Sequence, residues 1–387
     1  MNVMQSSTLS QPDLNEQTLR GLRCRTPFFV FSRRALIGNF QAYQKHLPAK
    51  TEICYAMKAN SEGPVLRTLH ETGASFEVAS TYELALLKKI GVPSHRIIHG
   101  SAVKPTDHIY EFVKYGVDRF AFDSEQELLK IAKYAPHARV YVRALVDDRS
   151  DCVCNLSEKF GASLEAAVVL LLKAKELGMT PYGISFNVGS QARNKNAWAR
   201  GIKDVSGAMT RLLAKGIKIQ VVNLGGGFPH SYQHDQSVPI IEEISECIRE
   251  AMKGLPYPVT FIVEPGRGLV ANTFALVTSV IGRNRRSNDH WLYLDAGVYN
   301  ALMESLTCQL NAKYRVASLN GHSSTFKDEF ILTGPTGDGL DVINRSVLLP
   351  AETDAGDRLA IYDTGAYTLS LATAFNGFLK PKIKVLY

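Results

Sequence analysis

The stretch Ile53-Cys54-Tyr55-Ala56-Met57-Lys58-Ala59-Asn60 indicates how the whole chain folds. Apolar residues run from Ile53 to Met57, as in a strand that is buried on both faces of a parallel sheet. Lys58 stands where this run gives way to polar residues. A lysine at a buried strand end is costly unless it is ion-paired or used, and burial favours the neutral amine that attacks carbonyls. Taken alone, this stretch fits an ion-paired structural lysine or a nucleophile.

The same pattern, a short apolar run followed by a helical segment, recurs outward from this stretch. The apolar runs span 51–58, 75–80, 96–101, 119–124, 139–145, 181–188, 220–226 and 259–265. The helical segments include 63–73, 81–90, 125–134, 163–178, 195–215 and 238–253. Their number and size predict a (β/α)8 TIM-type barrel. A doubly wound sheet is disfavoured, because no Gly-x-Gly-x-x-Gly turn follows the first strand.

After residue 272 the helical spacing gives way to short runs rich in Val, Ile, Leu and Tyr between turn residues, which predicts an all-β unit. A strand at 27–31 precedes the barrel and would pair into this unit. We therefore expect a barrel over 35–272 and a discontinuous β-sandwich or β-barrel domain over 1–34 and 273–387. Residues 1–26 read as a loosely held polar lead.

Composition narrows the class of protein. Of 387 residues, 45% are hydrophobic and 21% charged, and the first 24 lack the pattern of a signal peptide, so we expect a cytoplasmic globular protein without a membrane partner. The formal charge of +7 is scattered apart from Arg283-Asn284-Arg285-Arg286, which we interpret as a solvated turn rather than a nucleic-acid patch. The six cysteines include no Cys-x-x-Cys pair, so we expect no metal site.

Polar residues gather at the carboxyl ends of the predicted strands, the rim where barrels carry catalytic groups. They are Lys58, Glu77, Ser80, His99 to Ser101, Asp123, Arg143, Asn187 to Ser190, Gly225 to Gly227, and Glu264 to Arg267. Gly225-Gly226-Gly227 ends the seventh strand and Glu264-Pro265-Gly266-Arg267 the eighth. The loops at this place commonly bind phosphate, although a glycine triplet by itself also fits a tight turn. Arg267 would add a charge-assisted bond.

An amine, a phosphate site and a buried carboxylate at one rim describe a site for pyridoxal 5'-phosphate (PLP). The aldehyde requires an amine, the phosphate an anion site, and the pyridine nitrogen a carboxylate, for which Glu264 is the candidate. An aldolase would also use Lys58 and a phosphate site, but it would need no carboxylate for a pyridinium.

Ordered motifs then identify a family. They are Tyr55-Ala56-Met57-Lys58-Ala59-Asn60, Phe76-Glu77-Val78-Ala79-Ser80, Lys159-Phe160-Gly161, Val188-Gly189-Ser190, Gly225-Gly226-Gly227-Phe228-Pro229, Glu264-Pro265-Gly266-Arg267, Gly334-Pro335-Thr336, Asp357-Arg358, Gly365-Ala366-Tyr367-Thr368 and Asn376-Gly377-Phe378. Over roughly residues 25 to 387, the chain resembles the ornithine, diaminopimelate and arginine decarboxylases, most of all the ornithine decarboxylases. The resemblance implies the alanine-racemase-like fold, a barrel with a β domain.

The resemblance also implies roles for individual residues. Lys58 would hold PLP and Glu264 would pair with the pyridine nitrogen. The other cofactor contacts implied are Glu77, Arg143, Asn187, Ser190, Gly226, Gly227, Gly266, Arg267 and Tyr367. The family forms homodimers with shared active sites, in which the partner's Asp338 would bind the distal amine of the substrate. Segment 147–161 resembles the family's mobile loop.

The chain departs from the family at three places. Asn187 stands where the family has a histidine that stacks on the cofactor; an amide still fits over the ring but does not titrate near neutral pH. Gly337 replaces a cysteine that returns a proton to the substrate carbon, a catalytic position next to Asp338. A second substrate aspartate beyond the Gly297-Val298-Tyr299 turn is absent, and Thr307-Cys308 stands there. Tyr299 and Cys308 are therefore candidate substrate contacts, although Cys308 also fits a plain structural cysteine.

The predicted function is a PLP-dependent decarboxylase that acts on an amino acid with a distal amine, ornithine-like or lysine-like or a modified or carrier-bound relative, in polyamine biosynthesis. It would release carbon dioxide and an amine. One alternative is a decarboxylase whose altered protonation gives an aldehyde. Another is a catalytically silent homologue that binds as a regulator, against which the retention of Lys58, Glu264, Arg267 and Tyr367 argues.

Overall fold

The protein is described by a computed structural model, which covers residues 13–146, 152–154, 158–233, 238–306, 314–321 and 326–387. The chain divides into two compact units. One unit is the continuous stretch Asn39–Leu269, and the other joins Met1–Gly38 to Val270–Tyr387.

The continuous unit is a closed barrel of eight parallel strands, in which each strand pairs with the next and β11 returns to β2. Its strands are β2 Glu52–Ala56, β3 Ser75–Val78, β4 Ile97–His99, β5 Arg119–Phe122, β6 Arg139–Arg143, β8 Thr180–Ser185, β10 Val221–Asn223 and β11 Thr260–Val263. All eight lie within the apolar runs or overlap them, so the predicted TIM-type barrel is confirmed.

Alternate residues of these strands point into the barrel, because successive side chains of a strand face opposite sides. The interior cluster takes one residue from nearly every strand: Cys54, Ile98, Ala121, Tyr141, Tyr182, Val221 and Ile262. These side chains fill the middle of the barrel. Polar side chains that also point inward therefore lie at its two ends.

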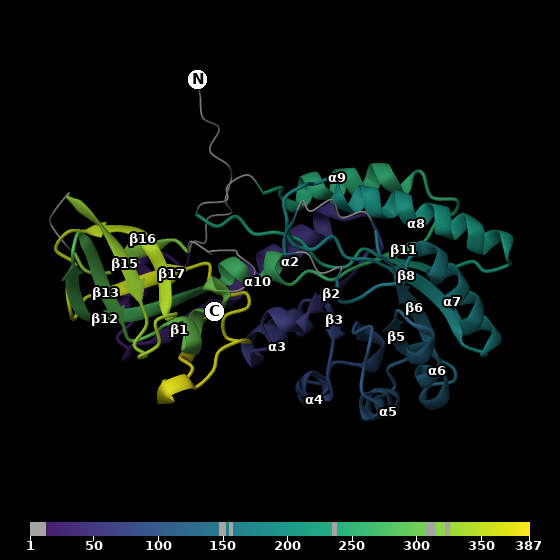
Figure 1. The fold of residues 1–387 in the computed structure, drawn as a ribbon, viewed down its shortest axis with the longest axis horizontal. Coiled ribbons are helices and arrows are strands. Elements are labelled where there is room, and N and C mark those ends of the chain that lie inside the picture. Colours follow the sequence, from purple (N-terminus) through teal and green to yellow (C-terminus); the bar gives the residue numbers. More distant parts are fainter. Residues whose placement is uncertain (1–12, 147–151, 155–157, 234–237, 307–313, 322–325) are drawn as a thin grey trace, which may run out of the picture. The chain divides into compact units, whose positions relative to one another are not determined.

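Helices surround the barrel on the outside, as Figure 1 shows. They are α3 Gly63–Glu71, α4 Thr81–Lys89, α5 Thr106–Tyr115, α6 Glu125–Tyr134, α7 Leu164–Glu176, α8 Ala197–Ala214 and α9 Ile241–Met252, and α2 Arg33–His46 leads into the first strand. Ser80, Ser124 and Ser163 accept backbone N–H groups and begin three of these helices. Caps this close to the strand ends keep the connecting loops of the rim short.

The discontinuous unit is an eight-stranded sheet. Six of its strands have the order β14-β17-β12-β13-β15-β16, β1 also pairs with β12, and β18 pairs with β1. Its strands are β1 Phe28–Ser32, β12 Phe274–Arg286, β13 Asp289–Leu294, β14 Val316–Ser318, β15 Lys327–Thr333, β16 Val342–Pro350, β17 Arg358–Tyr362 and β18 Lys382–Leu386. Strand β1 pairs antiparallel with β12 and parallel with β18, so the chain before the barrel joins the sheet that follows it.

Three local expectations are wrong. Part of the polar lead is packed: helix α1 Glu16–Gly21 begins at a cap from Asn15, and Leu14 and Leu19 are buried in the core of the sheet unit. Arg283 to Arg286 form the exposed end of β12, paired with β13, rather than a turn. Residues Met57–Ala59 form a 3-10 turn after β2 instead of continuing the strand.

Two short strands, β7 Cys152–Cys154 and β9 Ser190–Ala192, pair antiparallel beside the barrel. A short helix, α10 Arg267–Val270, follows the last barrel strand. Within the part of the chain that the structure describes, no helix has both the length and the apolar character that a membrane crossing requires.

Candidate active site

Lys58 lies on the 3-10 turn after β2, and Glu77 lies on the neighbouring strand β3. The Lys58 Nζ donates to Oε2 of Glu77 at 2.6 Å. The Lys58 side chain is 53% exposed, whereas that of Glu77 is 6% exposed. A Cβ atom at Gly100 would come within 2.3 Å of Oε1 of Glu77, so glycine is required there to make room for the carboxylate. The lysine is therefore ion-paired yet open to solvent, and the expectation of a buried lysine is wrong.

Glu264 follows β11, the strand on the other side of β2. Burial, and next the negative charge of Glu77, raise the pKa of Glu264 to about 7, while Lys58 acts in the opposite direction. Oε1 of Glu264 accepts a hydrogen bond of 2.7 Å from Nδ2 of Asn223. Lys58, Glu77 and Glu264 thus come from three consecutive strands of the barrel and interact electrostatically at one rim.

The glycine triplet after β10 packs against the loop after β8. Gly225 has φ +66°, and an added Cβ would lie 2.2 Å from the carbonyl oxygen of Phe186. Gly227 has φ +91°, and an added Cβ would lie 2.6 Å from the carbonyl oxygen of Gly189. Both the left-handed backbone and the close approach exclude other residues. The triplet, with the buried Gly226 between, therefore holds two loops of the rim together.

Arg267 is 4% exposed and binds two hydroxyl groups at the same rim. Its Nη1 donates to the Tyr232 hydroxyl at 2.8 Å, and its Nη2 donates to Oγ of Ser190 at 3.4 Å. A Cβ at Gly266 would lie 2.9 Å from Cβ of Ala59, so the loop after β11 also lies against the lysine turn. The structure thus brings together Ser190 and Arg267, two of the residues that the family resemblance implies as cofactor contacts.

Asn187 is bound to its own loop. Its Oδ1 accepts the backbone N–H of Gly189 at 2.8 Å, a local turn that fixes the approach to Ser190. The carbonyl end of the amide is thereby in use within the loop. Its predicted place over a cofactor ring stays a prediction.

Arg143 ends β6, and its guanidinium carbon lies 5.6 Å from the centre of the Phe160 ring. The Nζ of Lys159 lies 5.0 Å from the same ring. Arg143 also contributes to the electrostatics of Glu264, so it belongs to the rim. Of the predicted mobile loop, residues 147–151 and 155–157 lie outside the described residues.

In the sheet unit, Asp338 lies beside Tyr299. Burial, and next the carboxylate of Asp338, with which it hydrogen-bonds, raise the pKa of the Tyr299 hydroxyl. Asp341, which is 2% exposed, accepts the N–H of Val298 at 2.7 Å and both the N–H and the hydroxyl of Thr336, at 3.1 and 2.6 Å. One buried carboxylate thus ties the Tyr299 turn to the loop that carries Asp338.

Gly337 is exposed, and no atom lies within 4 Å of an added Cβ. Tyr367 has φ +56°, a left-handed conformation that is uncommon for an aromatic residue. An added Cβ at Gly365 would lie 1.8 Å from the carbonyl oxygen of Val270, so the loop that carries Tyr367 is packed closely onto its own unit. Cys308 lies outside the described residues.

Three organising residues were not found from the sequence: Asn223, Tyr232 and Asp341. Asn223 offered a signal, because it is a polar residue at the end of a buried strand and lies two positions before a glycine. Tyr232 offered none, since its partner Arg267 is distant in the chain, and Asp341 offered none for its distant partner Val298.

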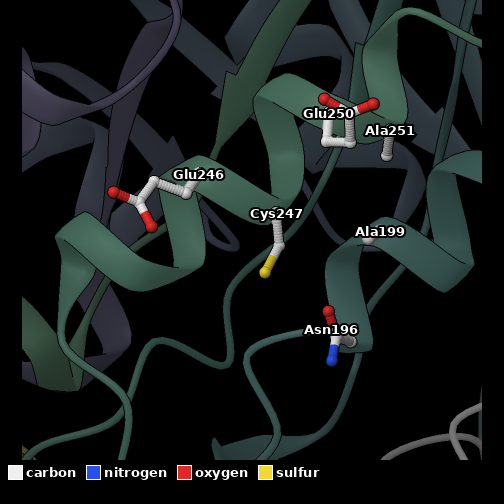
Figure 2. A pocket seen from close by; sticks show the side chains of 6 residues that line it. All are labelled: Asn196, Ala199, Glu246, Cys247, Glu250 and Ala251. Carbon is white, nitrogen blue, oxygen red and sulfur yellow. The ribbon is translucent and has the colours of Figure 1, made fainter.

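A separate hollow of about 420 Å³ opens between α8 and α9, as Figure 2 shows. It is lined by Asn196, Ala199, Glu246, Cys247, Glu250 and Ala251. It lies on the outer helices, and its lining contains no residue of the rim. The convergence of charged groups at the strand ends therefore makes the rim, and not this hollow, the candidate active site.

Comparisons with known proteins show the family to which the chain belongs. Residues 33–271 match the family model described as pyridoxal-dependent decarboxylase, pyridoxal binding domain. The chain is 34% identical to a lysine/ornithine decarboxylase of Selenomonas ruminantium, over 96% of this chain and 93% of that protein. It is also 34% identical to antizyme inhibitor 2 of Xenopus laevis, over 92% of this chain and 79% of that protein.

Among solved structures, the chain resembles a lysine/ornithine decarboxylase of Vibrio vulnificus in complex with putrescine. The TM-score is 0.84 and the sequence identity 32%, over 93% of this chain and 94% of that one. The similarity to this structure extends over nearly the full length of the chain and therefore includes both units.

Proposed function

We propose, from the premise that this chain belongs to the pyridoxal-dependent decarboxylase family, that it removes carbon dioxide from an amino acid with a distal amino group and leaves the corresponding amine. The observation that carries the proposal is the rim itself. There the amine of Lys58, the carboxylate of Glu264 and the hydrogen-bonded pair of Arg267 and Ser190 lie in segments that follow strands of one barrel.

These groups fit PLP in their chemistry. Lys58 supplies an amine for the aldehyde, and its half-exposed side chain leaves it accessible. Arg267 and Ser190, with Gly226, Gly227 and Gly266, supply donors for the phosphate, and we assign Tyr367 to the same phosphate. Bound PLP supplies an electron-accepting ring that allows the bond between the α-carbon and the carboxylate of the substrate to break.

The acidic residues of the rim have different tasks in this proposal. Glu77 accepts from Nζ of Lys58 and holds it in the direction of β3. Glu264 would accept a hydrogen bond from the protonated pyridine nitrogen, and its carboxylate would keep that nitrogen protonated. Arg143 adds positive charge beside Glu264, and Asn187 shapes the loop of Ser190.

The distal amine of the substrate is assigned to the sheet unit. Asp338 supplies a carboxylate, Tyr299 donates to it, and Asp341 holds both loops. Following the family, we propose a homodimer in which the partner's Asp338 completes each site. Mixing a Lys58→Ala chain with an Asp338→Ala chain should then recover part of the activity, since one hybrid interface contains an intact site. No recovery, despite proven exchange of subunits, would refute shared sites.

The substrate is tested by release of carbon dioxide from ornithine, lysine, arginine, diaminobutyrate and diaminopimelate. We expect ornithine and lysine to be the best substrates, because relatives that act on both cover nearly the whole chain. Asp338→Asn should raise KM for diamino acids far more than kcat falls, since the carboxylate binds the amine remote from the reacting carbon. Turnover of none of the five amino acids by a PLP-loaded protein would contradict the proposal and favour the silent regulator.

Gly337 supports a second candidate outcome, in which decarboxylation gives an aldehyde and the amino group of the substrate would stay on the cofactor as pyridoxamine phosphate. The family's cysteine would return a proton to the substrate carbon, and glycine has none to give. Because no atom lies within 4 Å of an added Cβ, cysteine can be introduced without a clash within the chain. If the wild type forms aldehyde, Gly337→Cys should raise the ratio of amine to aldehyde, measured by mass spectrometry. Amine as the sole product of the wild type would dismiss this candidate.

We propose a cytoplasmic role in polyamine biosynthesis, because putrescine is the amine bound to one structural relative. The division into a barrel domain over 35–272 and a β domain over 1–34 and 273–387 is kept as a proposal for where the functional domains begin and end. Assays of separate cell fractions would test the cytoplasmic location, and the polyamine content of a strain without the gene would test the role in polyamine biosynthesis.

A further inference from the structure

Asn223 is the last residue of β10, is fully buried, and uses both ends of its amide. Its Nδ2 donates to Oε1 of Glu264 at 2.7 Å, and its Oδ1 accepts the N–H of Gly225 at 2.9 Å. The backbone joins the same two loops, since the N–H of Glu264 donates to the oxygen of Gly225 at 2.7 Å. One side chain therefore connects the carboxylate after β11 to the glycine loop after β10.

We propose that Asn223 is a positioning residue, which fixes the direction of the Glu264 carboxylate relative to the glycine loop so that the ring nitrogen and the phosphate of PLP are bound together. The inference rests on the proposed function, because Glu264 and the glycine loop are the groups assigned to the two ends of that molecule. Asn223 itself lies behind both groups and is assigned no contact with PLP.

The position requires an amide for a chemical reason. An amide has a donor at one end and an acceptor at the other, which matches a carboxylate on one side and a backbone N–H on the other. Leucine has a similar size but offers neither. Aspartate offers an acceptor to Gly225, but it can donate to Glu264 only while the two carboxyl groups hold a proton between them.

The charged groups around Glu264 determine the pH range in which it would share a proton with an aspartate at position 223. Glu77 opposes ionisation of Glu264, whereas Lys58 and Arg143 favour it. The buried thiol of Cys54 and hydroxyl of Tyr141 also interact with this carboxylate. Burial and Glu77 already raise the pKa of Glu264 to about 7, so a second carboxylate beside it will hold a shared proton at neutral pH and release it at higher pH.

The test measures the dissociation constant of PLP by equilibrium dialysis against the full-length protein, from about pH 6 to pH 9, the range in which a coupled carboxyl pair of this kind titrates. The variants are Asn223→Leu and Asn223→Asp. The matched control is Asn320→Asp in the sheet unit. Asn320 has the same bonding pattern, because it donates to Oδ1 of Asp357 at 2.5 Å and accepts the N–H of Arg358 at 2.9 Å.

We expect Asn223→Leu to raise the dissociation constant by about tenfold or more at every pH, the usual effect of losing a hydrogen bond to a charged group. Asn223→Asp should bind nearly as the wild type does at the lowest pH and weaken toward the leucine variant as the pH rises. Asn320→Asp should leave the dissociation constant unchanged throughout. Rescue by pH alone, within one variant, separates a positioning role from a general loss of structure.

Two results would overturn the inference. The first is a folded Asn223→Leu protein with the dissociation constant of the wild type. The second is an Asn223→Asp protein whose affinity for PLP, weakened or not, does not depend on pH beyond the dependence of the wild type. If Asn223→Leu does not fold, the pH profile of Asn223→Asp still decides. A wild-type protein that does not bind PLP would instead refute the proposed function.

Discussion

At the amino ends of the barrel strands Glu52 and Arg119 form a closed ion pair, whereas at the carboxyl ends Lys58 and Glu77 form an open one. Arg119 is 3% exposed and donates to both carboxylate oxygens of Glu52, at 2.6 and 3.0 Å, and to the carbonyl of His95 at 2.6 Å. Lys58 makes a contact of 2.6 Å with Glu77 from a side chain that is 53% exposed. Similar distances thus join a buried cation at one end and an accessible one at the other.

The pKa values of Glu52 and Glu264, at the two ends of the strands, also shift in opposite directions. Burial acts to raise the pKa of Glu52, but the bond and charge of Arg119 outweigh it, so the pKa of Glu52 is lowered. Burial and Glu77 raise the pKa of Glu264. One end has carboxylates paired with cations and contributes to stability, while the other end has two interacting carboxyl groups, Glu77 and Glu264, near one accessible amine and is suited to chemistry.

Lys58→Ala should have the largest effect, and that effect should be on activity. Among the described strand-end residues of the rim, none besides Lys58 carries an amine, so we expect decarboxylation to fall by at least about a thousandfold. The free energy of unfolding should fall as well, because Glu77, which is 6% exposed, loses its Lys58 partner. Release of carbon dioxide and urea unfolding measure the two quantities, with Lys89→Ala on the exposed face of α4 as control. Substantial activity in Lys58→Ala would refute the distinction between the two ends.

Arg119→Met should have the opposite effect. It leaves Glu52 without its partner and should lower the free energy of unfolding by about 3 kcal/mol, with kcat per folded molecule nearly unchanged. The double variant Glu52→Gln/Arg119→Met should recover much of this loss, because no unpaired charge remains. Urea unfolding of both variants checks the prediction. A large fall in kcat with unchanged stability would show that this end also takes part in catalysis.

The sequence predicted the barrel because its strands lie in or overlap short, mostly apolar runs, a pattern set by burial on both faces. It also located the lysine, the acidic residues and the glycines of the rim, because side chains at strand ends in a barrel must meet. The exposure of Lys58 was not predictable, since a 3-10 turn of Met57–Ala59 turns it out of line with the strand.

Long-range side-chain contacts account for the rest of what was missed. The pairing of Glu52 with Arg119 joins residues far apart in the chain, and neither residue stands out in its own strand. Leu14 and Leu19 lie in a polar segment and are buried only because the sheet unit supplies a core for them. Local patterns specify elements well, but they do not specify which distant partner completes a polar group.

The pH dependence of stability should differ in sign between the two ends. A raised pKa means that folded Glu264 keeps its proton between about pH 4.5 and 7 while the unfolded chain loses it, so the free energy of unfolding falls as pH rises through this window. The contribution of Glu52, with a lowered pKa, is present above about pH 4.5 and is lost as pH falls below that value.

The contribution of Glu264 should be on the order of 3 kcal/mol, because one pKa unit corresponds to about 1.4 kcal/mol. Each contribution is measured as the difference in unfolding free energy between the wild type and Glu264→Gln or Glu52→Gln, in cofactor-free protein, from about pH 3.5 to 8. The Glu264→Gln difference should grow above pH 4.5 in favour of the variant, and the Glu52→Gln difference should grow there in favour of the wild type. Differences of the same sign would show that the two ends are electrostatically alike.

Asp118→Asn should have the smallest effect, and it tests whether burial or pairing makes the amino end stable. Arg139 donates to both carboxylate oxygens of Asp118, at 2.8 and 2.7 Å, so this pair is bidentate like the Arg119 pair. The two side chains are, however, 33% and 48% exposed, and the guanidinium also lies 5.0 Å from the Tyr182 ring. Water and salt screen such a pair, so we expect a loss of less than about 1 kcal/mol, which shrinks further at high salt. Urea unfolding at low and high salt, alongside Arg119→Met, gives the comparison: equal losses in the two variants would mean that the bidentate geometry alone, and not the burial of Arg119, stabilises this end of the barrel.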